Sequence, residues 1–181
     1  MTRFGRRSVA LGLGALALTG TFGTAGAAAA RIAGHDLRLV NLHTGEKTAI
    51  TYRIGERLVP DALREINHIL RDHRTDEVTK IDPGLLDLLH VLGRRLETRQ
   101  PFGIISGYRS PRTNAMLVGR GGGVAKRSLH MQGRAIDIRL AGIDPRQIYR
   151  AGRALGLGGV GLYTSSGFVH LDTGRVRYWG H

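Results

Sequence analysis

Residues 128–140 read Ser128-Leu129-His130-Met131-Gln132-Gly133-Arg134-Ala135-Ile136-Asp137-Ile138-Arg139-Leu140. From Ala135 onward an aliphatic residue occupies every second position, which predicts a β-strand with two unlike faces. One face is aliphatic and would pack against a core. The other face carries Asp137 beside the small side chain of Ala135, so the strand offers a carboxylate next to open space.

Histidines lie on both sides of this carboxylate in the sequence. His130 precedes the strand in a predicted loop, and Phe168–Asp172 predicts a second strand in which His170 and Asp172 share a face. The chain has no cysteine, so any metal must be held by histidine or carboxylate side chains. Two imidazoles and one carboxylate form a three-ligand zinc site with an open fourth position, as in catalytic zinc centres. His130, Asp137 and His170 could therefore converge on one Zn²⁺ ion, although each of the eight histidines, taken alone, is more often a surface or core residue than a ligand.

The rest of the chain alternates between helical and strand patterns. The pairs Asp82-Pro83 and Asp144-Pro145 are typical helix starts, with Asp as the N-cap and Pro at the first helical position. We expect a hairpin over 35–54, helices over 60–73, 83–99, 111–118 and 145–156, and strands over 102–106, 135–140, 159–163, 168–172 and 176–179, the last three antiparallel. This order predicts an α+β fold in which helices pack on one face of a small antiparallel sheet.

The N-terminus has the features of an export signal. Residues 1–7 contain three arginines and no acid, a glycine-rich apolar run follows, and Ala25-Gly26-Ala27 matches an A-x-A cleavage pattern. We therefore expect a signal peptide over 1–27 and a single folded domain over 28–181. The pair Arg6-Arg7 resembles the twin-arginine export signal, with a general secretory signal as the alternative. The apolar run is too weak for a stable anchor after cleavage, so we expect a protein of the periplasm or cell envelope.

Composition and charge narrow the class of partner. Hydrophobic residues make up 41% and charged residues 23%, which is typical of a globular domain. The net charge falls from +13 to +10 when residues 1–27 are removed, because they hold three arginines and no acid. Such a charge suits a polyanion. An exported protein meets carboxylate-rich peptidoglycan, and the chain lacks the interleaved aromatic residues of single-strand binders, so we expect no nucleic-acid partner. The sequence does not indicate an oligomeric state.

Three ordered motifs resemble one family. The spacing S-x-H-x-x-G-x-A-x-D of residues 128–137 resembles the first metal-binding signature of the D-Ala-D-Ala metallopeptidases, the group that also includes lysostaphin and the hedgehog signalling domain. Residues 105–110, followed by Asn114, resemble the substrate-side segment of that family. Residues 161–163 and 168–174 resemble its murein endopeptidase K branch.

The resemblance implies both a fold of this family and a set of roles. It assigns three zinc ligands, His130, Asp137 and His170. It implies that Arg109 orients a substrate carbonyl or carboxylate and helps to stabilise the oxyanion, that Ser128 forms a hydrogen bond near the site, and that Tyr108 lies on the substrate side. The activity that it implies is zinc-dependent endopeptidase cleavage of peptide cross-bridges in bacterial peptidoglycan.

The sequence departs from the family pattern at the general base. Many relatives carry an acid three positions before the last histidine ligand, where this chain has Gly167, and some carry a histidine two positions before it, where this chain has Phe168. Asp172, on the same strand face as His170, is our candidate for the base. The alternative is that Asp172 orients an imidazole, a common arrangement around metal sites.

Two other functions remain open at this stage. The first is a D-Ala-D-Ala or L,D-carboxypeptidase of the same family, which would need a closed pocket with a cation for the terminal carboxylate. The second is a noncatalytic wall-binding domain that keeps zinc for structure. The sequence does not distinguish between the D-Ala–diaminopimelate bond and the diaminopimelate–diaminopimelate bond as the bond that is cut.

Overall fold

The structure, a computed structural model, describes Met1, residues 34–121 and residues 124–180. The predicted signal peptide therefore lies outside the described residues, apart from Met1. None of the helices in the described ranges is long and apolar enough to cross a membrane. The described residues from Gly34 to Gly180 fall within one structural unit.

The central element is an eight-stranded sheet with the order β3-β2-β1-β4-β5-β7-β6-β8. The strands are β1 (Gly34–Asn41), β2 (Lys47–Ile54), β3 (Arg57–Leu58), β4 (Phe102–Ser106), β5 (Ala135–Leu140), β6 (Gly159–Tyr163), β7 (Phe168–Asp172) and β8 (Arg177–Trp179). β1 runs parallel to β4 and β6 runs parallel to β8, while the other neighbouring strands are antiparallel. The α+β class is confirmed.

The prediction of a small, purely antiparallel sheet is wrong. Two helices lie between β1 and β4 in the chain, and a connection of that length allows two strands to pair in parallel. The segment after β7 crosses to the far side of β6, so β8 pairs with β6 in parallel instead of extending a meander. β3, with two residues, is too short to produce a periodic pattern in the sequence.

The helices begin where the sequence predicts. They are α1 (Pro60–Ile69), α2 (Pro83–Arg95), α3 (Pro111–Gly119) and α4 (Pro145–Leu155), and each has Pro in its first turn. The side chains of Asp82 and Asp144 accept hydrogen bonds from backbone N–H groups and cap α2 and α4. α2 ends before the predicted residue 99, and Glu97 there has a positive φ of 50°, which a helix does not allow.

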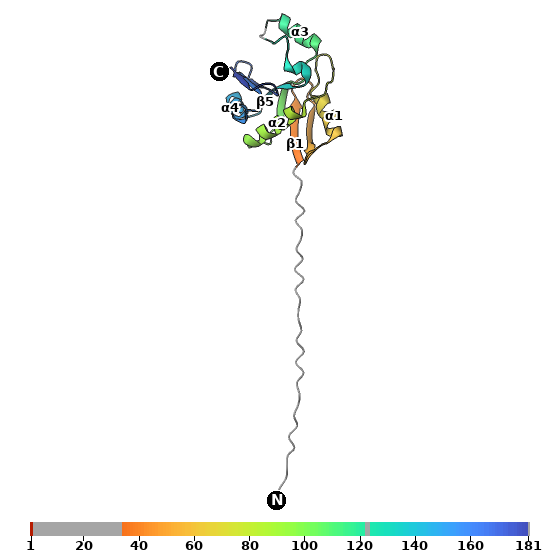
Figure 1. Ribbon diagram of the computed structural model, residues 1–181, viewed down its shortest axis with the longest axis vertical. Coiled ribbons are helices and arrows are strands. Elements are labelled where there is room, and N and C mark those ends of the chain that lie inside the picture. Colours follow the sequence, from red (N-terminus) through yellow and green to blue (C-terminus); the bar gives the residue numbers. More distant parts are fainter. Residues whose placement is uncertain (2–33, 122–123, 181) are drawn as a thin grey trace. The chain divides into compact units, whose positions relative to one another are not determined.

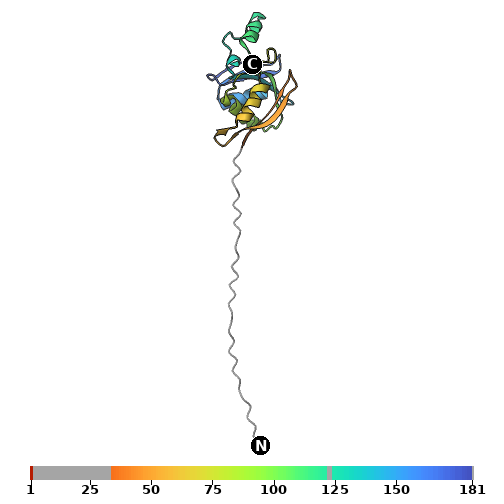
Figure 2. The ribbon, with the colours of Figure 1, turned by 90° about the vertical axis from the view of Figure 1, so that its right-hand side faces the viewer.

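The helices α1, α2 and α4 pack against the sheet, and α3 lies apart from them at one end of the domain (Figure 1). Turning the molecule shows these three helices inside the curve of the sheet (Figure 2). Leu85, Leu89 and Leu92 of α2 are fully buried in a core that also contains Ile136 and Ile138 of β5. The aliphatic face of β5 thus points to the core, which leaves Asp137 on the opposite face.

A buried carboxylate fastens the segment after α1 to the start of α3. Asp72 is 1% exposed, and its side chain accepts hydrogen bonds from the backbone N–H groups of Ser110 at 2.9 Å and Arg74 at 3.0 Å. Burial raises the pKa of Asp72, but hydrogen bonds from Thr113, Arg74 and Ser110 outweigh it and lower the pKa to about 2. Because Ser110 directly follows Arg109, this carboxylate also holds a predicted site residue in place.

Replacing Asp72 with Asn should lower the free energy of unfolding at neutral pH by about 2 kcal/mol, because the folded-state pKa lies about two units below the unfolded value. The wild-type advantage is complete above the ordinary pKa of 3.8 and is lost as the pH falls through about 2. Denaturant unfolding over an acid pH series measures both effects. Glu56→Gln, at an exposed turn, is the control and should leave the curve unchanged. Equal stability of the Asp72→Asn variant and the wild type would contradict this role.

Candidate metal centre

The site begins with the pairing of β5 and β7. Asp137 and His170 are opposite each other in this antiparallel pair, so their side chains project from the same face of the sheet. His170 Nδ1 lies 2.9 Å from Asp137 Oδ1. The register of two neighbouring strands therefore brings together two residues that are 33 positions apart in the sequence.

His130 reaches the same point from a short 3-10 helix, η1 (Leu129–Gln132), where the sequence predicted a loop. Gly133 ends η1 with a φ of 64°, and a Cβ at this position would collide with the carbonyl of Lys80. His130 is 2% exposed, and its Nδ1 lies 2.7 Å from the carbonyl oxygen of Gly107. Because a carbonyl only accepts, Nδ1 carries the proton and Nε2 keeps its lone pair for the site.

Three potential ligand atoms converge. His130 Nε2 lies 3.2 Å from His170 Nδ1 and 3.3 Å from Asp137 Oδ1, and the last two atoms are 2.9 Å apart. Ligands about 2.1 Å from a tetrahedral ion would lie about 3.4 Å from one another, so small movements suffice to admit a metal ion. In the described part of the chain this is the one group of three or more such side chains close enough to share an ion.

The charges around these atoms also favour a cation. Burial raises the pKa of Asp137, but the neighbouring imidazoles of His130 and His170 outweigh it and hold the pKa well below its usual range. Burial lowers the pKa of His170, but hydrogen bonds to Asp137 and Asp172 raise it to about 9. Without a metal, the two carboxylates thus attract a proton to His170. A metal ion would take the place of that proton, as metal binding to histidine commonly does.

The three residues lie in a cavity of about 500 Å³. Its lining includes Arg109 and Ser128 from the predicted site, and also the aromatic side chains Tyr163, Phe168 and Trp179. The Tyr163 and Phe168 rings are stacked with centroids 4.5 Å apart, and Trp179 Nε1 donates a hydrogen bond to Tyr163 Oη at 3.1 Å. These aromatic side chains form a wall beside the His170 imidazole, which is 5.2 Å from the Trp179 ring.

Arg109 is held loosely against the candidate ligands. Its Nη2 lies 3.5 Å from Asp137 Oδ2 and 3.4 Å from Ser106 Oγ, and its Nη1 lies 3.5 Å from Asn114 Oδ1. Its Nε is buried and has no hydrogen-bond partner among the described residues. Burial lowers the pKa of Arg109, and the Asp137 carboxylate opposes this effect. The guanidinium therefore remains a cation, and it has N–H groups at the edge of the cavity that are free to donate hydrogen bonds.

The other two predicted substrate-side residues lie differently. Ser128 caps η1, where its Oγ accepts a hydrogen bond from the backbone N–H of His130 at 3.4 Å, and it lines the cavity. Tyr108 lies outside that lining and packs against the hydrophobic core, while its backbone N–H donates to Leu70. The structure thus brings Ser128, but not the Tyr108 ring, to the cavity.

Asp172 lies behind His170 and is fully buried. Its Oδ2 is 2.9 Å from His170 Nε2, the ring nitrogen that faces away from the other two candidate ligands. Its carboxylate also accepts hydrogen bonds from the backbone N–H groups of Gly159 and Gly174 and two from the Arg177 guanidinium. A carboxylate offers about four lone-pair positions, so these five contacts occupy all of them. This arrangement favours the second interpretation of Asp172, the orientation of an imidazole.

Sequence reasoning missed Arg177 and the aromatic wall. Arg177 lies only five residues after Asp172 and forms hydrogen bonds with its carboxylate. Because a buried carboxylate needs a cation or several donors, a basic residue close to Asp172 in the sequence was a candidate partner. The aromatic residues come from three different strands. Tyr163 and Phe168 meet across the β6–β7 pair, but Trp179 joins them through the parallel pairing of β8 with β6, which the sequence pattern does not reveal.

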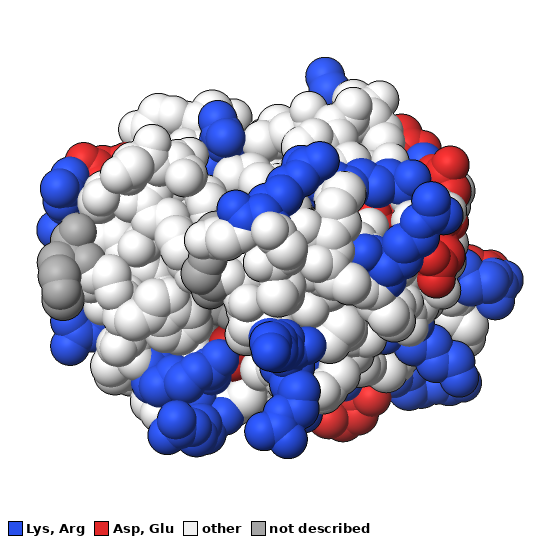
Figure 3. Space-filling view, turned by 90° about the horizontal axis from the view of Figure 1, so that it is seen from above, with Lys and Arg blue, Asp and Glu red and all other residues white. Residues whose placement is uncertain are grey.

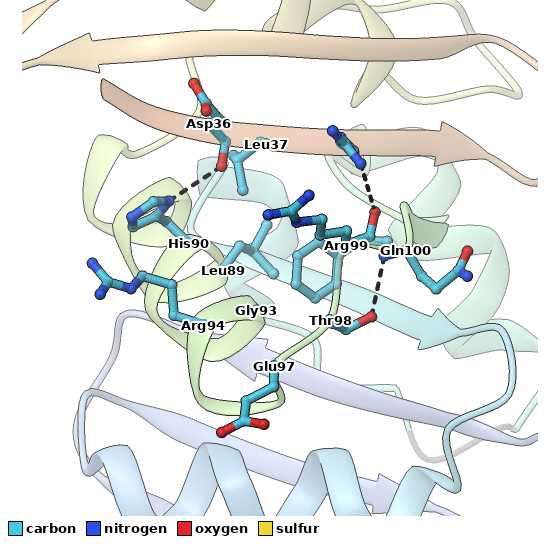
Figure 4. A pocket seen from close by; sticks show the side chains of 12 residues that line it. Asp36, Leu37, Leu89, His90, Gly93, Arg94, Glu97, Thr98, Arg99 and Gln100 are labelled. Carbon is cyan, nitrogen blue, oxygen red and sulfur yellow. Dashed lines mark hydrogen bonds between the residues drawn. The ribbon is translucent and has the colours of Figure 1, made fainter. Parts of the chain in front are cut away.

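A second cavity, of about 480 Å³, lies between α2 and β1 (Figure 4). It is lined by Asp36, His90, Arg94 and Arg99 over an apolar floor that includes Leu89. Its single histidine, His90, stands with Nδ1 3.2 Å from the carbonyl oxygen of Asp36. This cavity brings no group of candidate metal ligands together, so the chemistry of the described residues points to the first one.

Basic side chains are spread over the end of the domain at which α3 lies in Figure 1, and acidic ones appear mainly at its edges (Figure 3). This distribution agrees with the excess of lysine and arginine over acids in the sequence. A face of this kind attracts anionic material to the domain.

Comparison with known proteins shows which family this chain resembles. A family model described as "Peptidoglycan L,D-endopeptidase MepK" matches residues 28–179. The peptidoglycan L,D-endopeptidase MepK of Escherichia coli strain K12 is 43% identical over 178 residues, which cover 96% of each chain. The protein of the same name from Shigella flexneri has the same identity and coverage. A probable peptidoglycan L,D-endopeptidase MepK from Haemophilus influenzae is 39% identical over 140 residues, 77% of this chain and 75% of the relative.

Removing any one of the three candidate ligands should abolish metal binding. We expect His130→Ala, Asp137→Ala and His170→Ala each to lower the metal content from one ion per chain to a small fraction, because two ligands hold an ion weakly. Elemental analysis after dialysis measures this content. His90→Ala, which alters the second cavity, is the matched control and should keep its metal. Full metal content in any of the three variants would remove that residue from the ligand set.

Proposed function

Because this chain belongs to the peptidoglycan L,D-endopeptidase MepK family, we propose that it is a zinc-dependent hydrolase that cleaves L,D peptide bonds in the cross-links of bacterial peptidoglycan. The observation that carries this proposal is the convergence of His130 Nε2, Asp137 Oδ1 and His170 Nδ1 within 3.3 Å of one another. It occurs in a chain that matches its relatives over nearly its whole length. The site and the family thus support the same chemistry independently.

His130, Asp137 and His170 would hold the zinc ion, which supplies a Lewis acid that polarises a substrate carbonyl and acidifies water. The donor set suits this metal, because two neutral imidazoles and one carboxylate leave an open coordination position. His130 would bind through Nε2, since its Nδ1–H is donated to Gly107. His170 would bind through Nδ1, since its Nε2 faces Asp172.

Arg109 would stabilise the negative charge that develops on the carbonyl oxygen during attack. Its guanidinium lies beside Asp137, lines the cavity and has unused donor capacity. A fixed cation in a partly buried site acts on such a charge more strongly than it would in water. Ser128 supports the arrangement by fixing the start of η1, from which His130 projects.

Asp172 would orient His170. The general-base role stays a prediction, and it requires the carboxylate to release one of five hydrogen bonds and to reach past the imidazole that separates it from the cavity. The orienting role requires neither movement. The two roles differ in their effect on zinc binding.

The same family membership supports export, because the relatives are named for action on peptidoglycan. We propose that residues 1–27 direct export and are removed, so N-terminal sequencing of the exported protein should begin near Ala28. Replacing Arg6 and Arg7 with Lys separates the two export routes, because the twin-arginine route depends on this pair. Recovery of the intact Met1 terminus outside the cytoplasm would contradict the proposed cleavage.

Mass spectrometry of digested peptidoglycan tests the activity directly. The zinc-loaded protein should convert cross-linked peptides into uncross-linked ones by cutting bonds between an L- and a D-centre, and His130→Ala should release none. Release of terminal D-alanine with the cross-links intact would indicate a carboxypeptidase. Adsorption to peptidoglycan without any cleavage by the zinc-loaded wild type would indicate a wall-binding domain.

A further inference from the structure

Behind the candidate ligand His170 lies a series of hydrogen bonds through Asp172 to Arg177, a partly exposed residue to which the proposed function gives no role. His170 Nε2 lies 2.9 Å from Asp172 Oδ2, and the same oxygen accepts a hydrogen bond from Arg177 Nη2 at 2.7 Å. Arg177 Nη1 donates to the other carboxylate oxygen of Asp172 at 3.0 Å. The guanidinium and the carboxylate therefore form a two-pronged ion pair with a fixed mutual orientation.

Arg177 is itself fixed on two further sides. Its Nη1 also donates to the backbone carbonyl of Arg175 at 3.1 Å. Its guanidinium lies over the Trp179 ring, 5.0 Å from the centroid, and this ring is in turn 5.2 Å from the His170 ring. Trp179 thus packs against both ends of the series His170, Asp172 and Arg177.

Glycines leave the space that this arrangement occupies. A Cβ on Gly159 would collide with Arg177 Nη1 and Asp172 Oδ2, and a Cβ on Gly161 would collide with the Trp179 ring. A Cβ on Gly174 would stand 2.9 Å from Asp172 Oδ1, which is too close. At these three positions around the ion pair, only glycine, whose side chain is a single hydrogen atom, fits without a collision.

We propose that Arg177 is a positioning residue that selects the tautomer and orientation of His170. It holds the Asp172 carboxylate in place, Asp172 accepts the Nε2 proton of His170, and Nδ1 is left to face Asp137 and the metal. The inference rests on the metal site of the proposed function and adds a role for residues behind it.

The physical reason is that an imidazole has two nitrogens and can present either to a metal. The partner of the nitrogen that does not bind the metal decides which one is presented. Asp172 can serve only if its carboxylate stays ionised and fixed, although it is fully buried. A buried carboxylate needs a paired cation or several donors, and Arg177 provides the cation and two of the five hydrogen bonds.

A purely stabilising ion pair would behave differently. If Arg177 only supported the fold, its replacement would lower the melting temperature and leave the zinc affinity of the folded protein unchanged. A positioning role predicts a change in zinc affinity and in the protonation of the His170 ring, both of which are measured without substrate.

The test compares Arg177→Met with wild type and with Arg175→Met, a matched control that removes an exposed arginine two residues away but keeps its carbonyl. Zinc affinity is measured by competition with a chromophoric chelator, and the His170 tautomer by ¹⁵N-detected NMR of the zinc-loaded protein. We expect Arg177→Met to weaken zinc binding about 10-fold to 100-fold, as for partners of other metal-binding histidines. We also expect it to broaden or shift the Nε2–H signal. Arg175→Met should match the wild type in both.

Two further variants keep the inference testable if Arg177→Met fails to fold. Arg177→Lys retains the charge but loses the planar fork, so it should fold and recover only part of the zinc affinity. Gly159→Ala leaves Arg177 in the chain but pushes the ion pair apart, and should weaken zinc binding in the same direction. Wild-type zinc affinity and a wild-type His170 signal in the folded Arg177 variants would overturn the inference.

Asp172→Asn separates the two roles of this acid. If Asp172 positions His170, the variant loses zinc affinity together with turnover, whereas a general base would lose turnover alone. Failure of the zinc-loaded wild type to cut peptidoglycan would overturn the proposed function and leave the zinc and NMR readouts of Arg177 standing. The opposite pattern, full cutting with zinc binding indifferent to Arg177, would overturn only this inference.

Discussion

The register between β5 and β7 is the constraint on which the rest of this structure depends. It sets Asp137 opposite His170 and Ala135 opposite Asp172. A slip of one residue would turn Asp137 toward the core and expose Ile136 and Ile138, which are completely buried. The hydrophobic core therefore enforces the geometry of the candidate metal centre. Side chains alternate between the two faces of a strand, so burying the aliphatic residues of β5 places Asp137 on the opposite face, beside His170.

The candidate centre gathers groups that would destabilise the fold if each were buried alone. Asp137 and Asp172 are carboxylates with almost no exposed surface, and burying an unpaired charge is costly. Each is surrounded by donors: the two imidazoles and Arg109 at Asp137, and Arg177 with two backbone N–H groups at Asp172. The positively charged residues of this region thus compensate the negative charge of the two buried carboxylates, and this arrangement still admits a metal cation.

Much of this arrangement is visible in the sequence, for reasons that the structure makes clear. Period-two alternation and Asp-Pro pairs are local signals, so β5, β7 and the starts of α2 and α4 follow directly from them. The candidate ligands could be predicted because they lie within two short motifs. The parallel pairing of β8 has no local signal, since Arg177–Trp179 is three residues long and its partner is chosen by the connection before it. Arg177 was missed for another reason, because only the structure shows that Asp172 is fully buried and therefore needs a cation nearby.

The departure at position 167 has a structural explanation. Gly167 is the last residue of the turn between β6 and β7, with a φ of 68°, a conformation that most side chains rarely adopt. The turn that leads into Phe168–Asp172 therefore favours glycine at the position where the family pattern considered in the sequence analysis has an acid. Asp172 faces Nε2 of His170, the nitrogen turned away from the other two candidate ligands, and hydrogen bonds occupy its acceptor positions. Among the described residues that line the cavity, Asp137 is the one carboxylate. An acidic side chain at position 167 would have to adopt this positive φ, so the geometry of the turn opposes the family pattern at this position.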